Sequence, residues 1–432
     1  MIITRSWLEE FIDISKIPTD DICKTLNAIG FEVDSLERIS IAPKVVIGKV
    51  LEKEKHPDAD KLNICQVDLG THQVQIVCGA KNVEAGQFVP VATVGCDLGN
   101  NFVIKEAKLR GVESNGMICS ATELGLPKLN DGILELDDSI GELVLGKELK
   151  EYSKLNDDII EIGLTANRGD CLSINGIVRE LGAFYSIVLI ECDKKINYNK
   201  LGIGQLLEIE CDKHIDSSLS FIVIDFSDFK LNILQKLRTA IIGKFQENND
   251  VKNILTYTTH TTGVILNAYS KEKTIKGENL NIMYIKKDEL GFDNIYGTEQ
   301  LSKICVEHNE IDTNDTNFII EASYINPELI SKKVFDAKIK TGEVYYKASR
   351  GSEPNIDYGI NYLSTLVSKS GASIYGGCET FVEDKEKLTL DISVNKINAI
   401  IGQEIPKIEI ERILVSLGFV VKDIGSILVI KV

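Results

Sequence analysis

The chain has 432 residues and a formal net charge of −17, from 48 Lys and Arg against 65 Asp and Glu. With 44% hydrophobic and 26% charged residues, it is a globular chain of about two to four domains, which excludes disordered and fibrous proteins. The acidity argues against a simple basic nucleic-acid-binding protein. It favours a cytoplasmic protein, or one part of an assembly whose positive charge is local.

The sequence also argues against export, membrane insertion and metal binding. The first residues, MIITRSWLEEFIDISKIPTDD, are acidic and amphipathic, unlike a signal peptide, and the apolar runs are too short to span a bilayer. The ten cysteines, one of them Cys192, include no CxxC, and the five histidines include no HExxH or HxH. We therefore expect reduced, buried thiols, no membrane partner and no metal bound by this chain.

Residues 1–37 predict two short helices followed by a strand. Ser6 and Glu9 have the spacing of a capping box, in which the serine hydroxyl accepts the Glu9 amide. A second helix is predicted to begin near Thr19 and to end at Gly30, a residue typical of helix ends.

Residues 38–150 predict a small closed β-barrel. Five short strands are separated by turns that contain glycine, and they read KVVIGKVLEKEKH, LNICQVDLG, THQVQIVCGA, FVPVATVG and VIKEAKLRG. The OB-fold is the commonest five-stranded barrel, so we expect this fold.

The rest of the chain predicts three further segments. Residues 151–204 return to helix, most clearly from Asn175 to Tyr185. Residues 205–384 mix strands with three helices, around 230–245, 325–337 and 355–370. Residues 385–432 predict a strand, two helices and a hairpin within which the chain stops, which indicates a truncated domain. The fold class is thus α+β and multidomain.

No motif for ATP use or acyl transfer is present. The sequence lacks a P-loop, a GxGxxG after a strand, a GxSxG and a usefully spaced Cys/His pair. The adenylate-forming signatures of both synthetase classes are missing as well, so this chain alone shows no aminoacylation site.

Four stretches carry a family resemblance: HPDADKL at 56–62, IVCGAKNV at 76–83, KLRGVESNGMICSATELGL at 108–126, and IEIGLTANRGDCLSINGIVREL within 157–181. In this order they resemble the β subunit of bacterial phenylalanyl-tRNA synthetase (phenylalanine–tRNA ligase), in its N-terminal part. The barrel motifs are similar to those of free-standing tRNA-binding proteins, whereas TANRGDCLSINGIVRE is specific to this subunit.

The resemblance implies an architecture and partners. Residues 38–150 would be the OB-fold tRNA-binding domain, inserted in a small α/β module formed by 1–37 and 151–204. Residues 205–384 would be a mixed α/β editing-type module, and 385–432 a partial helical or winged domain. The partners would be the α subunit, in a heterotetramer of two α and two β chains, and tRNA(Phe), with no DNA. ATP and Mg²⁺ would serve the complete enzyme, with no cofactor bound by this fragment, and the location would be the cytoplasm.

The candidate RNA contacts on the barrel are cations and one aromatic side chain that can stack on a base. Carboxylates interleave with the lysines, five lysines against four carboxylates in the window 43–62, so these lysines could also simply solvate the barrel. We therefore expect weak tRNA binding by this fragment alone. The candidates are Lys44, Lys49, Lys61, Phe102, Lys105, Lys108 and Arg110.

Two polar motifs are interpreted as architectural. His56, Pro57 and Asp58 predict a turn. Asn167, Arg168 and Asp170 form a polar group before a helix, in which Arg168 could make a forked pair with a carboxylate, either within its module or across a subunit interface.

Tyrosine differs from phenylalanine by one hydroxyl, which an apolar pocket cannot reject strongly, so a second, hydrolytic site is chemically sensible. The resemblance places Glu321 at the family's hydroxyl-recognising Glu, Asn267 where the family carries His, and Tyr257 at a retained Tyr. The family's Thr-x-Ala turn corresponds to Gly342-Glu343-Val344.

This pocket departs from the family's pattern in a way that removes space. Val344 stands at the Ala position, and SKICVEH at 302–308 replaces a glycine-rich stretch. Packed interiors do not easily regain lost volume, so we predict a narrowed pocket with weak or lost deacylation. Glu321 could instead be a carboxylate at a strand end, solvated or paired with Lys332 or Lys333.

Two other functions stay open at this point. A free-standing tRNA-binding module or chaperone would use the same barrel, although the roughly 280 residues after it disfavour this. A hydrolase acting on aminoacyl esters would use residues 205–384, although the missing His and glycines disfavour that.

Overall fold

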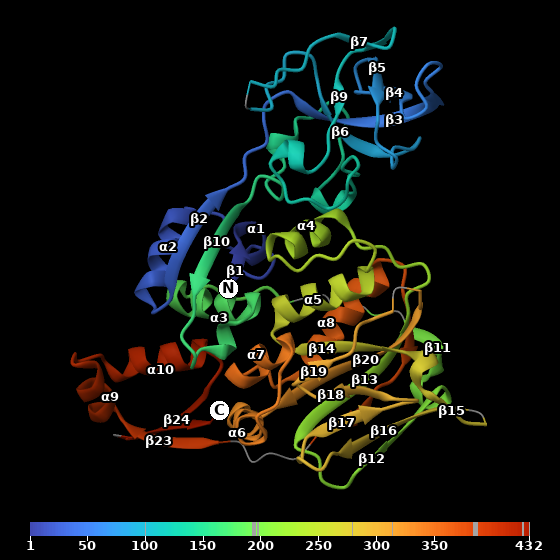
Figure 1. Cartoon of the computed structure of the whole chain (residues 1–432). Coiled ribbons are helices and arrows are strands. Elements are labelled where there is room, and N and C mark those ends of the chain that lie inside the picture. The colour runs from blue at the N-terminus through green and yellow to red at the C-terminus, as the bar shows by residue number, and fades with distance from the viewer. Residues whose placement is uncertain are drawn as a thin grey trace.

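The computed structural model describes residues 1–99, 101–191, 196, 198–278, 280–312, 314–382, 388–425 and 427–431. Cys192 and the predicted boundary at 384/385 lie outside these residues. Figure 1 shows a central body, a barrel above it and a small C-terminal module at its lower edge. Among the described residues, no helix is long and apolar enough to cross a membrane.

The N-terminal module joins two segments that are far apart in the sequence. Its antiparallel sheet has the order β1-β10-β2, and the barrel leaves and returns between β2 and β10 (Figure 1). Its strands and helices are β1 (Ile2–Thr4), α1 (Arg5–Leu8), α2 (Thr19–Ala28), β2 (Glu32–Arg38), β10 (Asp158–Gly163) and α3 (Ile174–Tyr185).

The capping box predicted at Ser6 is wrong. The residue that caps α1 is Thr4, whose side chain accepts the Trp7 N–H. Ser6 is engaged elsewhere, because its N–H and its hydroxyl both donate to the buried carboxylate of Asp157.

The barrel is a five-stranded antiparallel sheet in the order β5-β4-β3-β6-β9. It is nearly closed, since the Asn115 N–H donates to Gln75 O at 2.8 Å and the Val77 N–H to Ser114 Oγ at 3.1 Å. The strands are β3 (Val45–Lys55), β4 (Asn63–Asp68), β5 (Gln73–Cys78), β6 (Phe88–Ala92) and β9 (Met117–Ile118).

The fifth barrel strand is not the one predicted. The segment 103–111 contains β7 (Ala107–Leu109), which pairs only with β8 (Val112–Ser114) in a hairpin outside the barrel sheet. The true fifth strand, β9, has two residues, too few to produce an alternating pattern.

The central body consists of two stacked sheets. The first has the order β11-β21-β13-β20-β14, with β22 also paired to β13, and the second has the order β12-β16-β17-β18-β19, with β15 paired to β16. Their strands are β11 (Tyr198–Gly202), β12 (Leu207–Cys211), β13 (Ser217–Asp225), β14 (Ile265–Ser270), β15 (Ile275–Lys276), β16 (Asn281–Lys287), β17 (Asp293–Tyr296), β18 (Gln300–Lys303), β19 (Glu307–His308), β20 (Asn317–Ile325), β21 (Ser373–Gly376) and β22 (Glu379–Phe381).

Alternation along the strands of the first sheet gives it two buried faces. Phe221 and Tyr269 belong to a core that includes Ile285 and Ile295 of the second sheet. Ile320 and Ala322 face a core shared with the helices and with the N-terminal module. The predicted helices are confirmed as α4 (Ile233–Ile241), α6 (Pro327–Ala337) and α8 (Ile356–Lys369), whereas α5 (Asp250–Thr262) and α7 (Glu343–Arg350) were not predicted.

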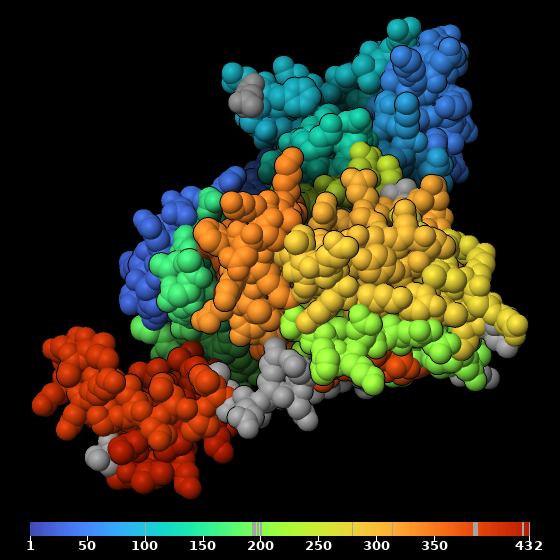
Figure 2. Space-filling model, turned by 60° about the horizontal axis from the view of Figure 1, so that its bottom comes forward, coloured from blue at the N-terminus to red at the C-terminus, as the bar shows by residue number. Residues whose placement is uncertain are grey.

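The C-terminal module has the predicted order of elements. Its sheet runs β23-β25-β24 around a small core of Ile410, Leu428 and Ile430, and Figure 2 shows it as a lobe at one edge of the body. Its elements are β23 (Thr389–Ser393), α9 (Val394–Ile401), α10 (Lys407–Ser416), β24 (Val420–Ile424) and β25 (Ile427–Lys431).

Short 3₁₀ helices complete the described elements, and they are η1 (Thr122–Leu124), η2 (Asp138–Ile140), η3 (Leu149–Glu151), η4 (Gly169–Cys171), η5 (Ile203–Gln205) and η6 (Lys271–Lys273). The predicted domain boundaries at 37/38, 150/151 and 204/205 fall inside β2, η3 and η5. The chain passes between the N-terminal module and the barrel through two stretches outside these elements, between β2 and β3 and between η3 and β10.

Candidate functional site

A buried histidine joins two loops at one end of the barrel. The Asp58 N–H donates to His56 Nδ1 at 3.1 Å, so the Nε2–H is left to donate to Leu109 O, also at 3.1 Å. The turn at 56–62 is therefore architectural, and it fixes the hairpin β7–β8 against the barrel.

Three of the predicted RNA contacts meet at this end. Lys61 lies in the turn that His56 anchors, while Lys108 and Arg110 lie in the hairpin, and all three are exposed. Lys108 also pairs with Glu113 at 3.2 Å, an exposed ion pair that contributes little to stability. Lys108 can therefore exchange this partner for a phosphate.

A second group of candidates lies around the loop 95–104. Lys44 Nζ donates to Gly95 O at 3.2 Å, and the side chain of Phe102 is 51% exposed. Lys105 follows the loop and is exposed too. Lys49 stands apart, with its Nζ 5.2 Å from the centre of the Phe88 ring. The structure thus divides the seven candidates into two groups of three and one separate lysine.

The polar group before α3 is held by Arg168. Its guanidinium donates to both oxygens of Asp170, at 3.0 and 2.9 Å, and to Glu180 at 2.5 Å. These interactions raise the pKa of Arg168. Asp170, Cys171 and Glu180 have the spacing of a metal site, but the arginine side chain contacts all three and takes that position. Asn167 is exposed beside it.

Glu321 lies deep between the two sheets of the body. Its side chain is fully buried. Its backbone lies opposite that of Asn267 in the pairing of β20 with β14. The Tyr269 hydroxyl donates to Glu321 Oε2 and lies 2.7 Å from Ser302 Oγ. Burial raises the pKa of Glu321 and that of Tyr269, so the site favours the neutral form of both groups.

The remaining pocket candidates are divided by the structure. The Gly342 N–H donates to Val306 O at 2.9 Å, and Val344 packs on the same core. Tyr257 is not in this group, because it lies on the other face of the first sheet, where its ring stacks on Trp7 at 4.8 Å. The structure therefore brings Glu321, Asn267, Gly342 and Val344 to one side of the sheet and leaves Tyr257 on the other.

Two interpretations of Glu321 as an ordinary surface carboxylate are wrong. Glu321 is not solvated, and Lys333 instead donates to Asp216 and to Gly291 O, both at 2.5 Å. The reason is topological, since Glu321 and α6, which carries Lys333, are separated by the end of β20.

Sequence reasoning missed two residues of this site. Tyr269 is two positions after Asn267 on the same strand, so the period of two could have placed it on the same face. Cys305 has a φ of +59°, a conformation that favours glycine, and it lies near Glu321. Burial raises the pKa of the Cys305 thiol. The backbone thus keeps a shape suited to glycine while the cysteine side chain fills space.

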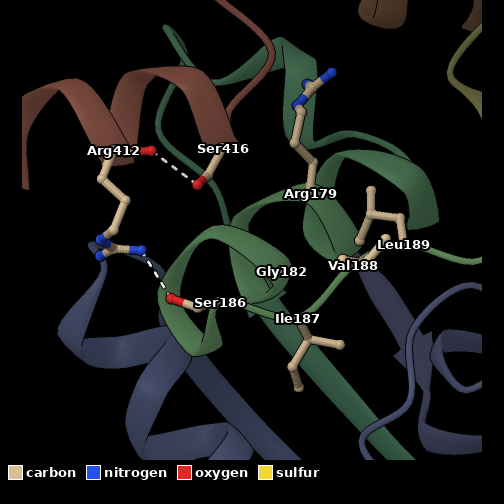
Figure 3. A pocket seen from close by; sticks show the side chains of 8 residues that line it. All are labelled: Arg179, Gly182, Ser186, Ile187, Val188, Leu189, Arg412 and Ser416. Atoms are coloured by element: carbon tan, nitrogen blue, oxygen red, sulfur yellow. Dashed lines mark hydrogen bonds between the residues drawn. The ribbon is translucent and has the colours of Figure 1, made fainter.

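An open pocket of about 300 Å³ lies between the end of α3 and α10 (Figure 3). Arg412 Nη1 donates to Ser186 Oγ at 2.8 Å, and the guanidinium also pairs with Glu409 at 2.7 Å. Arg179 points away from Arg412 in Figure 3. The two guanidinium groups do not converge, so the pocket is a junction between modules rather than an anion site.

The comparisons with known proteins agree with this layout. A family model described as "Putative tRNA binding domain" matches residues 45–142, the barrel. The phenylalanine–tRNA ligase β subunit of Wolinella succinogenes is 45% identical over 99% of this chain and 56% of that protein. The one of Sulfurimonas denitrificans is 43% identical over 97% of this chain and 55% of that protein. An N-terminal fragment of the phenylalanyl-tRNA synthetase β subunit from Pyrococcus horikoshii, a solved structure, is 11% identical and covers 64% of this chain and 81% of that chain with a TM-score of 0.29, which is too low to define a shared fold.

The barrel places the chain among proteins that carry a domain of the tRNA-binding family. Over nearly its whole length, the chain is homologous to the family of phenylalanine–tRNA ligase β subunits. It spans about half the length of the curated relatives it matches.

Proposed function

We propose that this chain works as part of the β subunit of a phenylalanine–tRNA ligase, where it binds tRNA and serves as a scaffold. The observation that carries the proposal is 45% identity over 99% of the chain, together with the barrel match at 45–142. The barrel, an OB-fold at 38–150, is the tRNA-binding domain. It is inserted in the module formed by 1–37 and 151–204, and residues 205–384 and 385–432 are the editing-type module and the start of a further, winged domain.

The partners follow from the same proposal. An α subunit carries out amino-acid activation with ATP and Mg²⁺, two α and two β chains form the enzyme, and tRNA(Phe) is the RNA substrate, in the cytoplasm. Co-expression with an α subunit tests this directly: a stable complex that charges tRNA with phenylalanine is expected. A chain that does not bind the α subunit but still binds tRNA would support a free-standing tRNA-binding module instead.

The RNA-facing end of the barrel is the group of Lys61, Lys108 and Arg110. In the assembled ligase, Arg110→Ala and Lys108→Ala should each weaken tRNA binding and reduce the slope of log K against log salt by about one. Lys49→Ala is the matched control, because Lys49 is engaged with Phe88. Equal effects of all three variants would contradict this assignment.

Deacylation at the editing-type module is weak or lost in this chain. Glu321 has a hydroxyl partner from the chain itself, the phenol of Tyr269, so a substrate phenol would have to displace it. Cys305, buried on the same side of the sheet, also takes space. Assays of the holoenzyme should show little hydrolysis of Tyr-tRNA. Robust hydrolysis that disappears in Glu321→Gln would overturn this proposal.

A further inference from the structure

The helix α4 lies directly between the barrel and the body (Figure 1). Its sequence neighbours belong to the body, yet Ile233 and Leu237 belong to a hydrophobic core that is otherwise built from residues 41–155. The barrel therefore has two kinds of attachment to the body: the two chain crossings near residues 39 and 157, and this helix.

The N-terminus of α4 has its own capping box, formed by Asn232 and Gln235, and it is also held by the barrel. The Ile233 N–H donates to Asp137 Oδ2 at 2.7 Å, and the Leu234 N–H donates to Ser139 Oγ at 3.2 Å. Asp137 also accepts the Ser139 N–H at 3.0 Å, which fixes both groups. A carboxylate at this position satisfies free N–H groups and complements the helix dipole.

The opposite side of α4 is held through Arg238, whose side chain is 1% exposed, by Tyr257 of the body and by residues of the N-terminal module. Arg238 Nη1 pairs with Glu10 at 2.6 Å and donates to the Tyr257 hydroxyl at 3.0 Å. Its Nη2 donates to Ser6 Oγ at 3.1 Å. The guanidinium is also 5.2 Å from the Trp7 ring. A fully buried arginine with several partners fixes geometry more than it adds stability.

The same network reaches the point where the chain crosses into the barrel. Ser6, which accepts from Arg238, donates its hydroxyl to Asp157 at 2.5 Å, and Asp157 O accepts the Ile39 N–H at 3.0 Å. Ile39 directly follows β2 and Asp157 directly precedes β10, so this bond joins the two segments in which the chain crosses between the N-terminal module and the barrel. A continuous set of hydrogen bonds therefore runs from Arg238 of α4 through Ser6 to the two segments in which the chain crosses into the barrel.

We propose that Arg238 and the Asp137 cap make α4 a strut that sets the angle between the barrel and the body, and that Arg238 is a positioning residue for tRNA. The hairpin β7–β8, which carries Lys108 and Arg110, lies at the far end of the barrel from α4 (Figure 1), so a small rotation about α4 displaces this hairpin most. The inference rests on the proposed tRNA-binding function, because the angle matters only if the barrel and its partner subunit hold one tRNA together.

The test uses the ligase assembled with its α subunit and three variants. Arg238→Met removes the contacts to the body, and Asp137→Ala removes the cap on the barrel side while leaving the body network intact. Lys236→Met removes a partly exposed cation from the same helix and is the matched control. Small-angle scattering reports the angle, and kinetics report the KM for tRNA and the rate of phenylalanine-dependent ATP–pyrophosphate exchange.

Both test variants should change the scattering curve and raise the KM for tRNA by about three- to tenfold, the size expected from the loss of one cap. The exchange rate should stay unchanged, since no amino-acid activation takes place in this chain. An unchanged KM despite a changed angle would overturn the proposal, as would an unchanged angle with a raised KM. Asp137→Ala keeps the test decisive if Arg238→Met does not fold. A wild-type enzyme that binds no tRNA would instead refute the proposed function.

Discussion

Glu321 is a carboxylate in an environment that disfavours its charge. It is fully buried between two sheets, with the Tyr269 hydroxyl as its hydrogen-bond donor. Burial raises its pKa above the usual 4.5, so the folded state binds this proton more tightly than the unfolded state does. The stability that this proton contributes is present below pH 4.5 and is lost as the pH rises through the raised pKa.

Replacing Glu321 with Gln should therefore flatten part of the pH profile of stability. The wild type should lose stability relative to Glu321→Gln as the pH rises above 4.5, because the glutamine cannot ionise. The free energy of unfolding, measured by urea titration at several pH values, gives the comparison. Glu278→Gln removes an exposed carboxyl and is the control. Parallel profiles for the wild type and Glu321→Gln would contradict the expectation.

Gly169 shows how closely two modules approach one another. A Cβ at this position would overlap Arg350 O and lie 2.6 Å from Gly351 O, so the loop before α3 and the end of α7 meet backbone to backbone. Gly169→Ala should destabilise the chain by about 1–3 kcal/mol, as overpacking does. Gly204→Ala is the matched control, since nothing lies within 4 Å of its Cβ position. Thermal unfolding should separate the two variants, and equal melting temperatures would show that the contact can relax.

Single residues were predicted well where local chemistry decides and poorly where distant partners decide. The turn at His56 follows from its own sequence. The role of Ser6 does not, because its partner Asp157 lies 151 positions away. Tyr257 lies on the other face of the sheet than predicted for the same reason, because Arg238 from α4 and Trp7 from the N-terminal module enclose it.

At the scale of elements, α5 is the clearest failure of sequence pattern. Five of its thirteen residues are threonines, which favour strands over helices. The threonine hydroxyls at 256, 261 and 262 instead donate to the carbonyl four residues earlier, and the core of the body covers the helix. Tertiary packing outweighs the weak propensity here, whereas the C-terminal elements, which follow a clear helical and strand period, were predicted correctly.

The hairpin β7–β8 gives a prediction for an element. It is attached to the barrel in part through the hydrogen bond from His56 to Leu109 O, and a buried hydrogen bond is worth about 1 kcal/mol. His56→Phe should therefore increase amide hydrogen exchange in residues 107–114 by about fivefold. His72→Phe is the control, because His72 is exposed. Unchanged exchange would mean that the bonds from Gln75 and Val77 to this segment hold the hairpin without His56.

At the scale of the whole molecule, the net charge of −17 takes on a more specific meaning. The barrel segment 38–150 holds 13 Lys and Arg against 16 Asp and Glu, so most of the acidity lies in the other modules. The barrel is therefore no basic patch, and its cations are useful only where they gather, at the ends described above. An RNA held by so few cations would need further contacts, as the proposed sharing of tRNA binding between subunits would supply.

The C-terminal module meets the N-terminal module where α10 contacts α3, and the side chain of Arg412 joins the two helices. It donates to Ser186 Oγ at 2.8 Å and to Ala183 O at 3.3 Å, both at the end of α3. Removing these bonds leaves the module with fewer constraints on its position, while its own core of Ile410, Leu428 and Ile430 is untouched. Arg412→Ala should therefore speed hydrogen exchange at the end of α3 and loosen the module as a rigid unit, without unfolding it.

Arg179→Ala is the matched control for this last expectation, because Arg179 lines the same pocket (Figure 3) but points away from Arg412. Its nearest carboxylate is Asp170, at 3.7 Å within its own module. Small-angle scattering from the full chain should show a wider distribution of interatomic distances for Arg412→Ala. For Arg179→Ala the distribution should match that of the wild type. If both variants widen the distribution equally, the pocket walls as a whole position the module and the bonds of Arg412 do not. If neither does, the apolar contacts between α10 and α3 suffice to hold it.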